Sequence, residues 1–165
     1  MRILILFTIC LFTIVPLQIK AQLSEVQSDI RALTQRIDSL ENELAYLKIF
    51  NEVRSLYNDI YKLNTDIKIS SINVEYYISN KFFKKRYWEV IRDNYKQCEK
   101  SLKTYKERVD QTSMLMIGNI LVNSFSEAEI GILTGTIKLA ENLCSQVESS
   151  LNIYKISIDT YEEGL

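Results

Sequence analysis

The sequence predicts an all-α fold, an antiparallel bundle of three long helices with coiled-coil-like heptad seams. Two observations lead to this class. Apolar residues recur at alternating spacings of three and four in three separate stretches, which is the pattern of helices that bury one face. The only proline, Pro16, precedes all three stretches and therefore interrupts none of them.

The first 21 residues resemble a secretory signal peptide. Met1 and Arg2 give a short positive start, an apolar run follows from Ile3 to Val15, and the small residue Ala21 ends the leader. The run is shorter than the roughly 20 residues that cross a bilayer, so we expect cleavage after Ala21, with an uncleaved anchor as the alternative. The prediction is an exported bacterial protein, periplasmic or secreted, with one domain over residues 22–165.

The net charge is −1, but the charges are unevenly distributed along the chain. Residues 23–67 carry a net charge of −3, residues 68–108 carry +6 and residues 109–165 carry −6. A basic middle between acidic flanks is typical of helices that pack together with complementary faces. A surface for nucleic acid or anionic lipid is the alternative, and nucleic acid is disfavoured because exported proteins rarely meet it.

The first helix is predicted over residues 23–67. Its apolar positions keep the 3-4 spacing as far as Leu47, slip around residues 48–52 and resume at Val53. The positions before the slip are Leu23, Val26, Ile30, Leu33, Ile37, Leu40, Leu44 and Leu47. Such a stripe requires a partner, either another helix of the same chain or a second protomer in a homo-oligomer.

Residues 68–81 are predicted to connect the first helix to the second. Ser70 and Ser71 interrupt the apolar repeat, and apolar residues then alternate from Ile72 to Ile78 as they would in a short strand. We therefore expect a connection that contains a small non-helical element.

A helical hairpin is predicted over residues 82–161. The seam of its first helix is Trp88, Ile91, Tyr95, Cys98, Leu102, Tyr105 and Val109. The seam of its second helix is Ile130, Leu133, Ile137, Ala140, Cys144, Val147, Leu151, Tyr154 and Ile158. Ser126 and Glu129 have the spacing of a capping box, which predicts where the second helix starts.

Two registers of this hairpin are open. Pairing residues whose numbers sum to 242 places Cys98 opposite Cys144, which in an oxidising compartment is a candidate disulfide. A register one heptad further on, with a sum of 249, places Cys98 against Leu151 and is favoured if the helix continues through Val122. Two buried free thiols are the alternative to the bridge.

The stretch from Tyr76 to Trp88 combines aromatic rings with cationic side chains. This composition suits stacking and phosphate contact on single-stranded nucleic acid. It is equally typical of the end of a helical bundle, where rings cap the core and Lys and Arg stems lie across them. We favour capping or a surface for a protein partner. The candidate docking residues are Tyr76, Tyr77, Phe82, Phe83, Lys84, Lys85, Arg86 and Trp88.

The stretch from Met114 to Val122, at the tip of the hairpin, is apolar on every side, so a two-helix seam cannot bury all of it. It is expected to fold onto the first helix, to dock a partner, or to touch a membrane as the tips of helical pore-forming toxins do. The candidate docking residues are Met114, Leu115, Met116, Ile117, Ile120 and Leu121. Gly131 and Gly135 nearby form a small-residue pair that another helix could approach closely.

Catalysis is not expected. The chain has no histidine, which removes His-based acid–base pairs, triads and zinc sites. Cys98 and Cys144 lie at seam positions, where burial raises the pKa of a thiol, and there is no phosphate-binding glycine loop. The sequence predicts no catalytic residue, no metal site and no cofactor.

The last 60 or so residues resemble a known family. The passages that carry the likeness are Lys103–Glu107, Met114–Phe125, Ser126–Ile130 and Lys138–Glu141. They resemble the exported TraI-like conjugal transfer proteins of conjugative transposons, which also begin with a signal peptide and continue as long helices. The family belongs to the envelope-spanning transfer machinery and is broadly similar to the helical minor pilus subunits of type IV secretion systems.

The resemblance implies a non-enzymatic structural or interaction protein, a periplasmic or surface component of a conjugative DNA-transfer apparatus with protein partners in the cell envelope. A periplasmic coiled-coil chaperone or adaptor is the second hypothesis. A helical pore-forming toxin, with direct membrane contact, is the third and rests only on the apolar tip.

Overall fold

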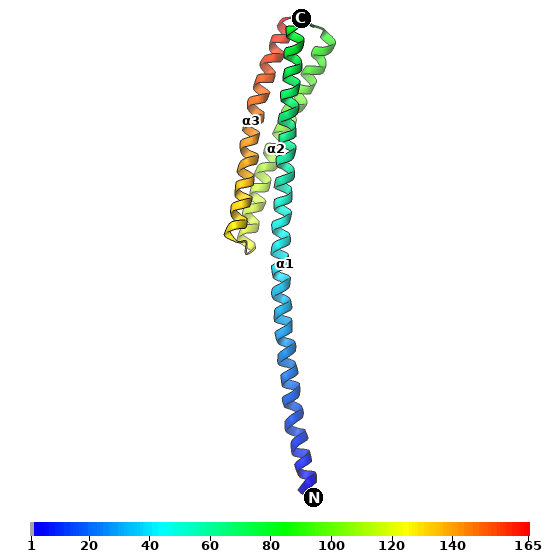
Figure 1. Cartoon of the computed structure of the whole chain (residues 1–165), viewed down its shortest axis with the longest axis vertical. Helices are drawn as coiled ribbons and strands as arrows, with labels where there is room; N and C mark the ends of the chain where they lie inside the picture. The colour runs from blue at the N-terminus through cyan, green and yellow to red at the C-terminus, as the bar shows by residue number, and fades with distance from the viewer. Residues whose placement is uncertain (1) are drawn as a thin grey trace. The chain divides into compact units, whose positions relative to one another are not determined.

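The computed structural model describes the backbone of residues 2–165 and the side chains of residue 20 and residues 22–165. Over this range the chain forms three helices, α1 (Arg2–Ser79), α2 (Lys85–Val122) and α3 (Glu127–Glu163), and no strand (Figure 1). The predicted all-α, three-helix fold is confirmed. The predicted signal peptide, residues 1–21, lies outside the described side chains apart from Lys20.

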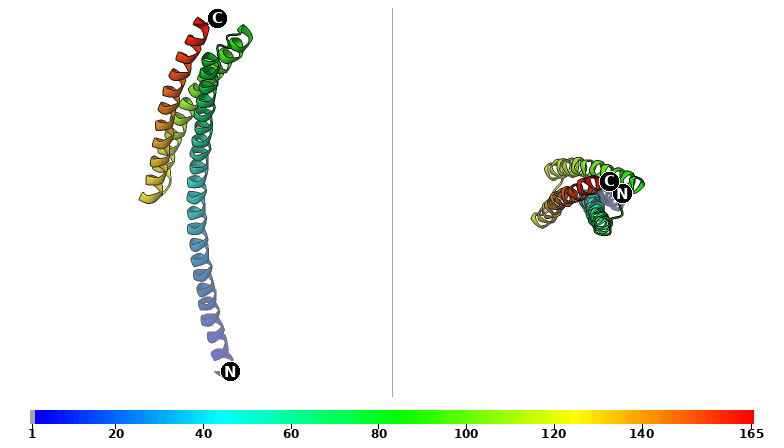
Figure 2. Two further views of the ribbon diagram at one scale, coloured as in Figure 1. Left: turned by 45° about the horizontal axis from the view of Figure 1, so that its top comes forward. Right: turned by 90° about the horizontal axis from the view of Figure 1, so that it is seen from above.

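The chain divides into two compact units, Met1–Leu44 and Ala45–Leu165. The first unit is a single helical stretch. The second is the bundle, in which α2 and α3 lie beside the part of α1 that is coloured cyan to green (Figures 1 and 2). α2 runs antiparallel to both of its neighbours, because short loops join it to each of them. α1 and α3 therefore run in the same direction.

The core of the bundle is built by the predicted seams of all three helices. Eight seam residues are less than 2% exposed and so exclude water from the centre: Val53, Leu56, Ile60, Ile67, Leu133, Ala140, Val147 and Tyr154. The seam of α3 is buried from Leu133 to Ile158, as its spacing predicts. In α2 the larger rings lie at the margin, since Trp88, Tyr95 and Tyr105 are only partly buried against the core.

The prediction of a non-helical connection over residues 68–81 is wrong, because α1 continues to Ser79. Ile67, Ser71 and Val74 are all buried at 3-4 spacing, so Ser71 fills a seam position and the apolar face is not interrupted. Its hydroxyl lies 3.5 Å from that of Ser157 on α3. The alternating residues Ile72 and Tyr76 face solvent. The loop itself is the short segment 80–84.

The second loop fixes the register of α2 against α3. α2 continues through Val122 and α3 starts at Glu127, with Ser126 and Glu129 forming the predicted capping box. A turn centred midway between Val122 and Glu127 pairs residues of α2 and α3 whose numbers sum to 249. Tyr95 and Tyr154 form such a pair, and their ring centroids lie 5.9 Å apart.

The disulfide expected for the other register is absent, and Cys98 and Cys144 are both free and buried. In the observed register Cys144 lies one heptad away from the position opposite Cys98, or roughly 10 Å along the helix axis. Cα atoms more than about 7 Å apart cannot be bridged without backbone movement.

The basic middle helix pairs with acids on both neighbours. Arg108 contacts Glu52 at 2.8 Å and Asp59 at 3.4 Å, both on α1. Lys106 contacts Glu148 on α3 at 2.8 Å. These pairs are partly exposed and each contributes little to stability, but together they match the alternation of charge along the sequence.

Candidate docking surfaces at the two ends of the bundle

Tyr161 holds the loop between α1 and α2 in place. Its side chain is fully buried, and its hydroxyl donates to the carbonyl of Phe82 at 2.6 Å while accepting from the amide of Lys84 at 2.8 Å. The ring of Phe83 packs on the ring of Tyr161, with centroids 5.2 Å apart. The loop is therefore fixed to the end of α3, although Tyr161 itself lies outside the predicted seam.

The turn after α1 has the hydrogen bonds of a Schellman motif. The amide of Phe82 donates to the carbonyl of Tyr77 at 2.8 Å, and the amide of Lys81 donates to that of Ile78 at 3.0 Å. Lys81 has a φ of 58°, the left-handed conformation that this motif requires and that glycine adopts most readily. Lysine at this position carries a backbone strain that the rest of the turn must offset.

In the aromatic and cationic stretch around this loop, some side chains pack against one another and others are exposed to solvent. Tyr77 stacks on Tyr87 with centroids 5.5 Å apart, and the Lys84 ammonium lies 5.8 Å from the Tyr87 centroid. The Arg92 guanidinium covers the ring of Trp88 at 4.4 Å. These contacts fit the predicted capping role. The predicted residues that remain exposed are Tyr76, Phe82, Lys84, Lys85 and Arg86.

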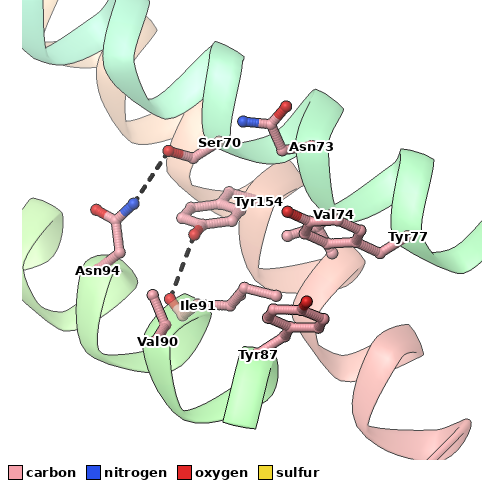
Figure 3. Close-up of a pocket in the computed structure, with 9 residues that line it drawn as sticks. All are labelled: Ser70, Asn73, Val74, Tyr77, Tyr87, Val90, Ile91, Asn94 and Tyr154. Atoms are coloured by element: carbon pink, nitrogen blue, oxygen red, sulfur yellow. Dashed lines mark hydrogen bonds between the residues drawn. The ribbon is translucent and has the colours of Figure 1, made fainter. Parts of the chain in front are cut away.

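A small pocket of about 160 Å³ lies between the helices near this end (Figure 3). The Tyr154 hydroxyl donates to the carbonyl of Ile91 at 3.2 Å, and the Asn94 amide donates to the hydroxyl of Ser70 at 3.1 Å. Burial raises the pKa of Tyr154 to about 12, so its phenol remains protonated at neutral pH. The first hydrogen bond links α3 to α2 and the second links α2 to α1, so the polar groups around the pocket hold the three helices together.

The other end of the bundle exposes most of the predicted apolar tip. Met116 is 6% exposed and Ile120 packs partly against the core, so the side chains of these two residues turn inward. The remaining apolar side chains of the stretch are exposed, by 53% to 84%. We call these residues the tip face: Met114, Leu115, Ile117, Leu121 and Val122.

The tip face is continuous. At 100° per residue its five members fall on one side of α2, with Gly118 among them, and Met116 and Thr112 fall on the opposite, buried side. The prediction that the whole tip folds onto the first helix is therefore wrong for this side of the helix. A helix on the surface of a folded protein normally has a polar outer side, whereas the stretch Met114–Val122 of α2 has apolar side chains on both its inner and its outer side.

The thiols of Cys98 and Cys144 are buried, which disfavours their thiolate forms. Burial raises the pKa of Cys98, with a further contribution from the charge of Asp66. Burial also raises the pKa of Cys144, more than the nearby Lys106 lowers it. Within the described side chains no group of His, Cys, Asp and Glu is placed to hold a metal ion. No helix in the described part of the chain combines the length and apolar character needed to cross a bilayer.

The chain matches no protein-family model, no curated protein and no solved structure.

Proposed function

We propose that this chain is a non-enzymatic, exported structural and interaction protein, a periplasmic or surface component of a conjugative DNA-transfer apparatus of the type IV secretion kind. The observation that carries the proposal is the exposed tip face. Apolar side chains gathered on one side of a folded helix are typical of a surface that binds another protein. The passage from Lys103 to Glu141, which resembles the conjugal transfer proteins, contains this face.

The proposal is tested by crosslinking in the native envelope, followed by affinity purification of the tagged chain. The informative variant is Leu121→Lys with Val122→Lys, because both side chains are more than 80% exposed and a cation suits the end of a helix. The matched control is Leu139→Lys with Ile156→Lys, two exposed positions on α3. We expect the original chain and the control to recover secretion-channel or pilus proteins, and the tip variant to lose them.

A mating assay supplies the functional readout. Donor cells that lack the chain should transfer DNA at a lower frequency, and the control variant should restore transfer while the tip variant does not. Recovery of assorted unfolded envelope proteins, with normal transfer, would instead indicate a coiled-coil chaperone or adaptor. Leakage of dye from liposomes that depends on the tip face would indicate a pore-forming toxin.

A further inference from the structure

The first part of α1 carries an apolar stripe that the chain leaves in solvent. The eight seam residues from Leu23 to Leu47 are each between 43% and 63% exposed. Their 3-4 spacing is unbroken, and the helix is continuous through them. Helices with a bare apolar stripe seldom persist alone in water, because most helical stability comes from packing of that stripe.

We propose that residues 23–48 form a parallel, in-register, two-stranded coiled coil with a second copy of this chain. In the heptad abcdefg, the a positions are Leu23, Ile30, Ile37 and Leu44, and the d positions are Val26, Leu33, Leu40 and Leu47. β-Branched residues at a combined with leucine at d favour two strands over three or four. Ile30 and Ile37 with Leu33 and Leu40 supply this combination in the middle of the repeat.

The charges beside the stripe favour the parallel orientation. In a parallel pair, each g residue faces the e residue five positions further along the other copy. Arg36 at g then faces Glu41 of the second copy, and Glu43 at g faces Lys48. The symmetry of the dimer forms each pair twice. The other two g residues, Gln22 and Asp29, face the uncharged Gln27 and Thr34, so no like charges meet.

The antiparallel alternative is electrostatically unfavourable. Full overlap of the stripe in that orientation brings g residues opposite g residues. Arg36 would then face Arg36 of the second copy, and Asp29 would face Glu43. Since like charges across such an interface repel, the same sequence that supports the parallel pair opposes this one.

The charged residues are available for these contacts. Arg36, Glu41, Glu43 and Lys48 are all exposed, and none of them forms an ion pair among the side chains that the structure describes. The second copy needs no other component, so this inference is independent of the proposed function and can fail or succeed separately from it.

The first test measures the mass of the purified full chain in solution by light scattering over a range of concentrations. We expect a dimer. Leu33→Asp with Leu40→Asp should weaken dimerisation at least about 100-fold, because two layers of the stripe would bury charge. The matched control, Gln35→Asp with Ser39→Asp, changes the outer side of the same helix and should remain dimeric. A monomer, or a trimer or larger assembly, would overturn the proposal.

The second test determines orientation. Leu40→Cys should form a disulfide between the two copies under mild oxidation, because in-register d positions lie opposite each other; full antiparallel overlap would separate them by roughly 15 Å. Arg36→Glu should weaken the dimer about tenfold, and adding Glu41→Arg should restore it. No crosslink, or no rescue by the exchanged pair, would refute the parallel arrangement.

Discussion

Ser150 on α3 donates a hydrogen bond to the amide oxygen of Asn64 on α1, at 2.9 Å and with both residues buried. One heptad further along, Ser71 and Ser157 face each other across the same interface. Each pair is 86 residues apart in sequence, so both define one parallel register of α1 against α3. Sliding α1 along α3 would bury these polar groups without partners, so the two pairs favour this register over shifted ones.

The effects of substituting Asn64 and Ser150 on the free energy of unfolding should be strongly non-additive. Ser150→Ala leaves the buried amide oxygen of Asn64 without its donor, and we expect it to lower the free energy of unfolding by about 1–3 kcal/mol. Adding Asn64→Leu removes the unpaired group, so the double variant should recover most of that loss. Denaturant unfolding of all four proteins measures the cycle. Additive effects would show that the hydrogen bond does not matter in this layer.

Tyr161 should be important for the loop between α1 and α2. Tyr161→Phe keeps the ring but removes the hydroxyl that bonds both Phe82 and Lys84, and we expect a loss of about 1–2 kcal/mol in the free energy of unfolding. Tyr61→Phe is the control, because Tyr61 is 58% exposed and its loss should cost less than about 0.5 kcal/mol. Equal stability of the two variants would contradict the role assigned to Tyr161.

The sequence predicts the bundle well where apolar spacing is regular. It identifies three helices, the capping box at Ser126 and the buried face of α3. The prediction from sequence fails at Ser71, because a polar residue at a seam position resembles the end of the apolar repeat. The hydroxyl of Ser157, which faces that of Ser71, makes the polar residue compatible with the core. Tyr161 is missed for a related reason, since its hydroxyl bonds a loop that the heptad pattern does not describe.

The candidate docking surfaces are predictable from the sequence only in part. Composition selects Met114–Val122, but which of its side chains point inward, as Met116 does, and which point outward, as Leu121 does, depends on how α2 packs in the bundle. Similarly, the hairpin register follows from where α2 ends, and the apolar run Met114–Val122 does not itself show whether the helix turns within it or continues through Val122. A heptad repeat alone leaves such shifts of seven residues nearly equivalent.

The two glycines of α3 should tolerate alanine. A Cβ added at Gly131 or Gly135 would meet nothing within 4 Å. Each substitution should therefore raise the free energy of unfolding by up to about 1 kcal/mol through helix propensity. Thermal unfolding tests this, with Gly164→Ala as the contrast because its Cβ would collide with the ring of Phe83. Loss of partner capture by a stabilised variant would reveal a close helix–helix contact at these glycines.

The left-handed turn at Lys81 should be improved by glycine. Lys81→Gly removes the strain of a Cβ at positive φ, and we expect a gain of roughly 0.5–1 kcal/mol in the free energy of unfolding. The neighbouring Asn80→Gly substitution is the control, because Asn80 has no positive φ and should gain nothing. Urea unfolding compares the two. Destabilisation by Lys81→Gly would mean that the lysine side chain itself stabilises the turn.

The bundle should lose stability in alkaline solution. Burial raises the pKa of Cys98 and Cys144 in the folded state, whereas an unfolded thiol titrates near about 8.5. Above that pH the unfolded chain releases protons that the folded chain retains, so the free energy of unfolding falls as pH rises. Urea midpoints at pH 7 and pH 9.5 measure the fall. The variant Cys98→Ala with Cys144→Ala should be less stable at pH 7 but should lose less between the two pH values. An unchanged pH dependence in that variant would exclude the thiols as its source.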